Sequence, residues 1–72
     1  MEQKEILHTI GRRLKARREE LGMTQAELSY KCDTDPSYIR KVESGKVNIS
    51  IGNLAEMAIA LEITLSELLI DL

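Results

Sequence analysis

The sequence contains no tryptophan or phenylalanine, and it has one cysteine, one proline and one histidine. Cys32 has no partner for a disulfide within the chain, and Cys32 and His8 together are too few soft ligands for a zinc site. No apolar run approaches the ~18 residues that a membrane span requires. The N-terminus, MEQKEIL, lacks the apolar segment of a signal peptide. These absences predict a cytoplasmic protein with no metal, no cofactor and no membrane anchor.

The residue patterns of enzymes are missing as well. The sequence shows no paired carboxylates, no nucleophile with a suitably spaced base, and no phosphate-binding loop. We therefore expect neither catalysis nor a small-molecule substrate. The 72 residues suffice for one domain, residues 1–72, and a chain of this size buries only ~60% of the surface that it exposes when unfolded.

Charge is distributed unevenly along the chain, whose formal net charge is −2. Residues 1–46 hold all ten Lys and Arg against eight acids, whereas residues 47–72 hold four acids and no base. A molecule polarised in this way can present a basic face even though its total charge is acidic.

Apolar residues recur with helical spacing through the whole chain, and no segment alternates as a strand does. Helix starts are indicated by Thr24 with Glu27, by Asp35 with Pro36, by Ser50, and by Thr64 with Glu67. Gly22 and Gly45 mark helix ends. The sequence thus predicts an all-α fold, a compact five-helix bundle. The apolar positions expected to face its core are Ile10, Leu14, Leu21, Ala26, Leu28, Cys32, Ile39, Val42, Leu54, Met57, Ala58 and Leu61.

One cation interrupts the apolar stripe of the first helix. Arg18 lies four residues after Leu14 and three before Leu21, so it belongs to the row that faces the core. A buried cation requires a carboxylate partner, and Glu43 lies on the same side of the third helix as Ile39. We predict a structural ion pair between Arg18 and Glu43; the alternative is that Arg18 extends to solvent.

The third helix, DPSYIRKVESGK in residues 35–46, has two different faces. Ile39, Val42 and Glu43 point inward, whereas Ser37, Arg40, Lys41 and Ser44 share the outer face. The second helix precedes it by a short turn, Asp33-Thr34. Two short helices joined by a tight turn, the second with a cationic outer face, predict a helix-turn-helix whose second helix enters the major groove of DNA.

Three segments carry a resemblance to a known family: MTQAELSYK at 23–31, YIRKVESGK at 38–46 and SIGNLAEMAIALEI at 50–63. Taken together, residues 10–69 resemble the lambda-repressor-like (Cro/repressor type) helix-turn-helix family. Within that family, the chain looks like the small controller proteins of restriction–modification systems, which are single-domain dimers that regulate transcription. The residues that carry this closer likeness are Tyr38, Ile39, Val42, Glu43, Gly45, Asn48 and Ser50.

The resemblance implies a double-stranded, palindromic DNA operator as partner and assigns roles to individual residues. Those implied to read base edges are Pro36, Ser37, Arg40 and Lys41. Those implied to contact the DNA backbone are Thr24, Gln25, Tyr38, Ser44, Lys46 and Asn48. Arg18 and Glu43 match an ion pair of the family. Pro36 departs from the pattern, because its side chain cannot hydrogen-bond a base, so readout must pass to the other three.

Several assignments stay open at this point. Tyr38 is interpreted equally well as a core residue or as a phosphate contact. The exposed cations of the first helix form either a solvated face or, at Arg12 or Arg13, a backbone contact. Asp33 and Asp35 are interpreted as helix caps that place negative charge near the groove, and His8 is expected to take no part.

The end of the chain predicts dimerisation. In a fifth helix over residues 64–72, Leu65, Leu68 and Leu72 share one stripe, whereas Leu69 and Ile70 point elsewhere. An exposed apolar patch usually marks an interface, and two recognition helices one DNA turn (~34 Å) apart are needed to read a palindrome. We therefore predict a homodimer interface; the alternative is a loosely packed, frayed end. The interface residues expected are Leu65, Leu69, Ile70 and Leu72.

Two other functions share this fold class, because a helix-turn-helix does not force DNA binding. A protein-interaction module would need aromatic or aliphatic anchors on the outer face of the third helix, where this chain has serine, arginine and lysine. An antitoxin would need an added toxin-binding segment, and none is evident. The sequence therefore favours a DNA-binding transcriptional regulator.

Overall fold

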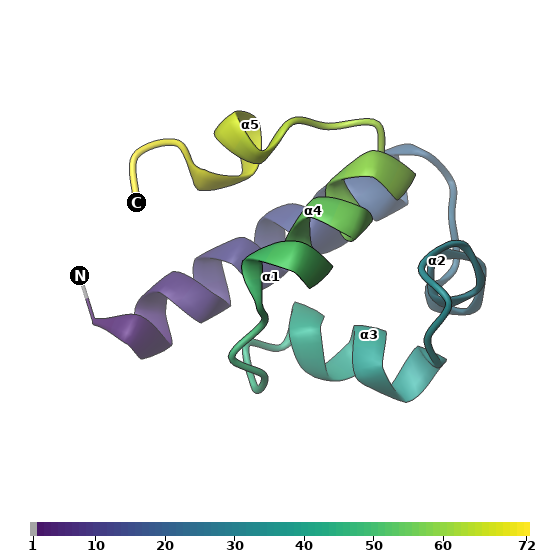
Figure 1. Cartoon of the computed structure of the whole chain (residues 1–72), viewed down its shortest axis with the longest axis horizontal. Helices are drawn as coiled ribbons and strands as arrows, with labels where there is room; N and C mark the ends of the chain where they lie inside the picture. The colour runs from purple at the N-terminus through teal and green to yellow at the C-terminus, as the bar shows by residue number, and fades with distance from the viewer. Residues whose placement is uncertain (1) are drawn as a thin grey trace.

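The computed structural model describes residues 2–72, which fold into five helices and, within that range, no strand. The helices are α1 (Gln3–Glu20), α2 (Gln25–Lys31), α3 (Pro36–Glu43), α4 (Ile51–Ala60) and α5 (Leu65–Leu69). Figure 1 shows α3 on one side of the long helix α1 and α5 on the other, with α2 at one end of the molecule. The all-α prediction is confirmed. No helix in the described range combines the length and the apolar character needed to cross a membrane.

The core is aliphatic, as the composition requires. Seven side chains are less than 2% exposed, six of them from the five helices and one from the residue just after α4. Because they come from every helix, no helix can separate from the bundle without exposing apolar surface. These side chains are Leu14, Leu28, Ile39, Leu54, Met57, Leu61 and Leu68.

The predicted helix starts are confirmed by hydrogen bonds. Thr24 and Thr64 each form a complete capping box, with Glu27 and Glu67 respectively. Asp35 accepts from the backbone N–H of Tyr38, and Ser50 accepts from that of Asn53. Hydrogen bonds from Thr24 and Thr64 hold the pKa values of Glu27 and Glu67 below the ordinary glutamate value, so both caps stay ionised at neutral pH.

Two core positions were predicted wrongly. Leu21 is 36% exposed because α1 ends at Glu20, so the stripe of that helix does not continue through Leu21; Met23 packs on the core nearby. Ala26 is exposed and Ser29 is buried in its place. The hydroxyl of Ser29 donates to the carbonyl of Ala26 at 2.7 Å, which makes the burial of this polar side chain tolerable.

The fifth helix is shorter than predicted. It ends at Leu69 rather than Leu72, because Ile70 has an extended backbone (φ −60°, ψ 136°) and Asp71 has φ 61°. Arg13 of α1 donates to the carbonyls of Leu68 at 2.9 Å and Ile70 at 2.7 Å. These bonds satisfy carbonyls that have no partner within the helix where α5 ends.

A second arginine of α1 binds backbone carbonyls at the C-terminal end of α4. Arg17 donates to the carbonyls of Leu61 at 2.8 Å and Glu62 at 3.2 Å, just after the last turn of α4. Cations are favourable at helix C-termini, where carbonyls point outward and the helix dipole is negative. Arg13 and Arg17 therefore attach the C-terminal third of the chain to α1. Arg13 is thus held within the chain, and a contact of Arg12 or Arg13 with the DNA backbone stays a prediction.

Gly11 allows α1 and α3 to approach closely. It is buried, and a Cβ atom at this position would lie 2.5 Å from the carbonyl oxygen of Glu43 and 2.6 Å from that of Val42. No side chain fits there without separating the helices. Gly11 thus sets how deep the C-terminal end of α3 sits against α1.

Candidate nucleic-acid interface

The turn between α2 and α3 fixes the angle at which α3 leaves the bundle. Asp33 adopts a left-handed conformation (φ 53°), which a short polar side chain tolerates. The N–H of Thr34 donates to the carbonyl of Ser29 at 2.9 Å and closes the end of α2. Asp33 therefore forms the turn and is not the cap of α3, which corrects the interpretation from the sequence; Asp35 alone has that role.

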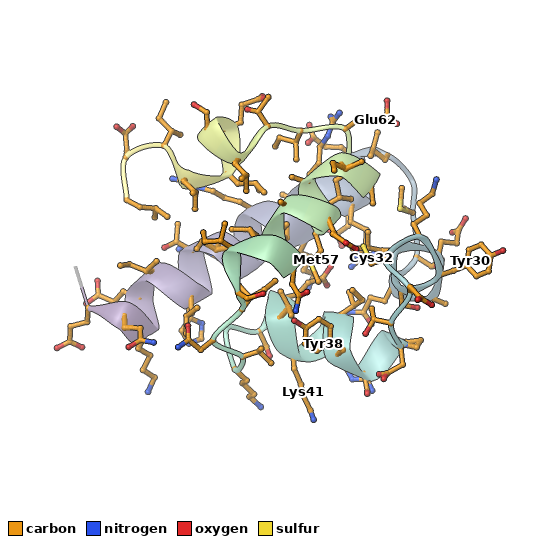
Figure 2. The ribbon with its side chains drawn as sticks, viewed as in Figure 1. Tyr30, Cys32, Tyr38, Lys41, Met57 and Glu62 are labelled. Atoms are coloured by element: carbon orange, nitrogen blue, oxygen red, sulfur yellow. The ribbon has the colours of Figure 1, made fainter. Side chains whose placement is uncertain are left out.

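The two faces of α3 are separated as predicted. Ile39 and Val42 are buried, whereas Arg40 and Lys41 are exposed. In Figure 2, Lys41 projects away from the bundle at its lower edge. The packing of the inner face leaves the cations of the outer face free to meet a ligand.

Glu43 is the centre of a buried polar network. It accepts from Nε and Nη2 of Arg18 at 2.6 and 3.1 Å, in the paired geometry that makes arginine–carboxylate contacts strong. Both residues are 8% exposed. Donation of hydrogen bonds to the Glu43 carboxylate raises the pKa of Arg18 above its usual value. The ion pair predicted from the sequence is present.

Gln25 extends this network to α2. Its amide nitrogen donates to Oε1 of Glu43 at 3.0 Å, and Nη1 of Arg18 donates to the carbonyl of Met23 at 2.7 Å. One carboxylate therefore ties α1, α2 and α3 together. Because an amide group carries two N–H donors, one donor of Gln25 stays available for a DNA phosphate.

The start of α3 is preorganised by Asp35. Its carboxylate accepts from the hydroxyl of Ser37 and, at 3.0 Å, from the backbone N–H of Tyr38. These bonds hold the pKa of Asp35 below its ordinary value, so the charge persists near the outer face. Since the hydroxyl proton of Ser37 is used within the helix, Ser37 presents an acceptor to a ligand, whereas Arg40 and Lys41 present donors.

The sequence left open whether Tyr38 is a core residue or a phosphate contact, and its position in the structure is compatible with both. Its ring is half-buried and packs on the core, and Figure 2 shows it beside Met57 of α4. Its hydroxyl accepts from Nδ2 of Asn53 at 3.2 Å. The hydroxyl proton is left to donate, so a phosphate contact by Tyr38 remains a prediction.

Cys32 shares with Tyr38 and Met57 the lining of a groove between α4 and the turn that precedes α3. Desolvation by burial raises the pKa of its thiol, so the thiol stays protonated at neutral pH. Cys32 acts here as a small apolar residue, as the sequence suggested. In residues 2–72, no three His, Cys, Asp or Glu side chains gather as metal ligands.

The loop after α3 begins with a tight helix end. Gly45 adopts φ 76°, and the N–H of Lys46 donates to the carbonyl of Lys41 at 2.9 Å. The hydroxyl of Ser44 donates to that same carbonyl at 3.0 Å. Lys46 and Asn48 are exposed, as a contact with the DNA backbone would require.

Sequence reasoning gave no particular role to Lys15. In the structure, Lys15 shares the lining of a shallow depression with Arg40, Ser44, Gln25 and Glu43. The depression thus places a cation of α1 beside the outer face of α3. The local sequence around Lys15 gave no signal of this position, because it depends on how α1 packs against α3.

Comparison with known proteins gives relatives over most of the chain. A helix-turn-helix family model matches residues 14–68. The Mycoplasma control protein C.MunI is 38% identical over 58 residues, which cover 81% of this chain and 78% of the relative.

Solved structures match the fold closely. The restriction–modification controller protein C.AhdI from Aeromonas hydrophila superposes with a TM-score of 0.88 at 34% identity, covering 94% of this chain and 99% of that one. The controller protein C.Esp1396I, crystallised as a tetramer with its natural 35-base-pair operator, gives a TM-score of 0.80 at 32% identity, covering 88% and 83%.

Proposed function

Because this chain belongs to the helix-turn-helix family, we propose that it binds double-stranded operator DNA as a homodimer and regulates transcription in the cytoplasm. The observation that carries the proposal is the outer face of α3. Arg40 and Lys41 are exposed there, while the opposite face is fixed by apolar packing and by the Arg18–Glu43 pair. Cationic donors on a rigid, exposed helix fit the guanine O6 and N7 acceptors of the major groove.

Among regulators, we propose a restriction–modification controller. The relatives C.MunI, C.AhdI and C.Esp1396I are control or controller proteins, and C.AhdI matches this chain over nearly its full length. An adjacent methyltransferase or endonuclease gene would support the assignment. A genomic neighbourhood without either would argue for a different regulator of the same family.

The size of the chain supports the use of more than one copy. Its longest dimension is 31 Å, slightly less than one turn of DNA at ~34 Å. An operator of 35 base pairs, as bound by the C.Esp1396I tetramer, extends over ~120 Å at ~3.4 Å per base pair. One copy of this chain spans about a quarter of such a site.

The proposal is tested first by selecting DNA from a random pool with the purified protein and footprinting the selected sites. We expect protected half-sites related by a two-fold axis, with centres separated by about one DNA turn or a multiple of it. Failure to enrich any sequence above background would contradict the proposed function.

Base readout is tested by substitutions on α3. Arg40→Ala or Lys41→Ala should cost on the order of 1–3 kcal/mol on the selected site and relax the preference at particular base pairs. Lys46→Ala should weaken binding to operator and scrambled DNA alike, and should reduce the salt slope by about one unit. Titrations on both DNAs measure this. Equal losses on both for Arg40→Ala and Lys41→Ala would remove these residues from the readout.

We propose that the dimer interface lies at the end of the chain, among Leu65, Leu69, Ile70 and Leu72. Leu65 and Leu69 are half-buried against the core of their own chain, whereas Ile70 and Leu72 are 59% and 38% exposed. We place the second copy against these two exposed side chains. Leu65 and Leu69 lie between these side chains and the core of their own chain and contribute the inner part of the proposed interface.

Ile70→Glu is therefore expected to weaken dimerisation by at least about tenfold, because it places a charge in an apolar contact. Sedimentation across a range of concentrations measures the effect. Ile59→Glu is the matched control, since Ile59 is 79% exposed on α4. An equal loss for both variants, or for neither, would exclude Ile70 as a specific interface residue.

A further inference from the structure

The cations of α1 have three different surroundings. Arg18 is buried with Glu43, and Arg13 and Arg17 donate to carbonyls of the C-terminal third. The four remaining basic residues of this helix are exposed. They follow one another at intervals of four, four and three residues, which places them on one face. We call this set the α1 stripe: Lys4, His8, Arg12 and Lys15.

The α1 stripe is continuous with the outer face of α3. Lys4, His8 and Arg12 line one depression together with Thr9 and Glu5, the one acid in it. At the other end, Lys15 lines the depression that includes Arg40 and Ser44.

Between these ends, the stripe touches the loop after α3. A Cβ atom at Gly45 would lie 3.0 Å from Cα and Cγ of His8, so the loop that carries Lys46 packs directly on α1. Figure 2 shows side chains tipped with nitrogen projecting from the same lower edge of the molecule as Lys41. The α1 stripe, the loop after α3 and the outer face of α3 thus adjoin one another.

We propose that the α1 stripe binds the sugar-phosphate backbone of the operator beyond the base pairs that α3 reads. Lys4 and Lys15 are eleven residues apart, so the stripe extends ~16 Å along the helix, a distance of about five base pairs at ~3.4 Å each. Exposed lysine and arginine side chains without a carboxylate partner bind phosphates independently of base sequence and release counterions.

This inference rests on the proposed function. It also accounts for DNA binding by a chain of negative net charge, which the cations of α3 alone do not explain. The net charge of the chain is −2, which opposes binding to a polyanion unless the cations are gathered on the bound face. The α1 stripe adds Lys4, Arg12 and Lys15 to Arg40, Lys41 and Lys46 on that face, while the acids of residues 47–72 lie in α4, α5 and the segments around them.

The experiment measures the dependence of operator affinity on salt for Lys4→Ala, Arg12→Ala and Lys15→Ala. Lys31→Ala is the matched control, because Lys31 is an exposed cation on α2 outside the stripe. Each stripe variant should lower the slope of log K against log[salt] by about one unit, equally on operator and scrambled DNA, whereas Lys31→Ala should not change the slope. Circular dichroism and thermal melting establish that each variant is folded.

Operators carrying single neutral methylphosphonate linkages identify the phosphates. A linkage that weakens binding of the wild type but not of Arg12→Ala marks the phosphate that Arg12 contacts. Unchanged slopes for the stripe variants would overturn the inference and leave the proposed function intact. Equal changes for Lys31→Ala would also overturn it, since the effect would then come from total charge. A wild type that binds no DNA would overturn the proposed function as well.

Discussion

Glu43→Ala is expected to lower the free energy of unfolding by roughly 3 kcal/mol or more. The substitution removes three hydrogen bonds, two from Arg18 and one from Gln25. It also leaves the guanidinium of Arg18 buried without a counter-charge, which is the larger cost. Chemical denaturation measures the change, and an effect below ~1 kcal/mol would mean that Arg18 reaches solvent in the variant.

A double substitution separates the two parts of this cost. In Arg18→Met with Glu43→Leu, no charge remains in the core, so we expect much of the stability lost in Glu43→Ala to return. Recovery should be incomplete, because Gln25 and the carbonyl of Met23 lose their partners. Equal stability for the single and double variants would show that the stranded charge is not the main cause.

Gly11→Ala is expected to destabilise the fold by roughly 1–3 kcal/mol and to weaken operator binding as well. The added methyl group would lie 2.5 Å from the carbonyl oxygen of Glu43, and that carbonyl is backbone that cannot rotate away. The C-terminal end of α3 must therefore move outward, which displaces Arg40 and Lys41 from their positions relative to Lys15 and Gln25.

Gly52→Ala is the matched control. A Cβ atom there would meet only the hydroxyl of Ser50, at 4.0 Å, and Gly52 lies within α4. Alanine is a better helix former, so this variant should be more stable by ~0.5–1 kcal/mol. Thermal melting and operator titration of both variants test the contrast. Operator affinity that stays unchanged in Gly11→Ala would mean that α3 does not shift.

The positions of the helices could be predicted because each start is marked by local chemistry. Thr24 and Thr64 with their glutamates, Asp35 with Pro36, and Ser50 are signals that involve neighbours within four residues. The Arg18–Glu43 pair was predictable for a different reason: a cation in an apolar stripe requires a partner, and Glu43 was the carboxylate that faced inward.

Features that depend on contacts between distant segments could not be predicted in this way. Where α5 ends, Arg13 donates to the carbonyl of Ile70, which is 57 residues away in sequence. The closeness of α1 and α3 at Gly11 and the position of Lys15 beside Arg40 likewise appear only once α1 has been placed against α3. A glycine within a helix and a lysine on a charged helix carry no sign of such neighbours in their local sequence.

The network at Glu43 also determines how the recognition helix moves. To open α3 alone, the protein must withdraw one carboxylate from both Arg18 and Gln25 and expose Ile39 and Val42 to water, so α3 has little freedom to unfold locally. Amide hydrogens in α3 should then exchange close to the rate of global unfolding, while those of the last residues after Leu69 exchange sooner. A helix that is already rigid loses little conformational entropy on docking, so the protein can sample many DNA sites rapidly without refolding its reading surface at each one.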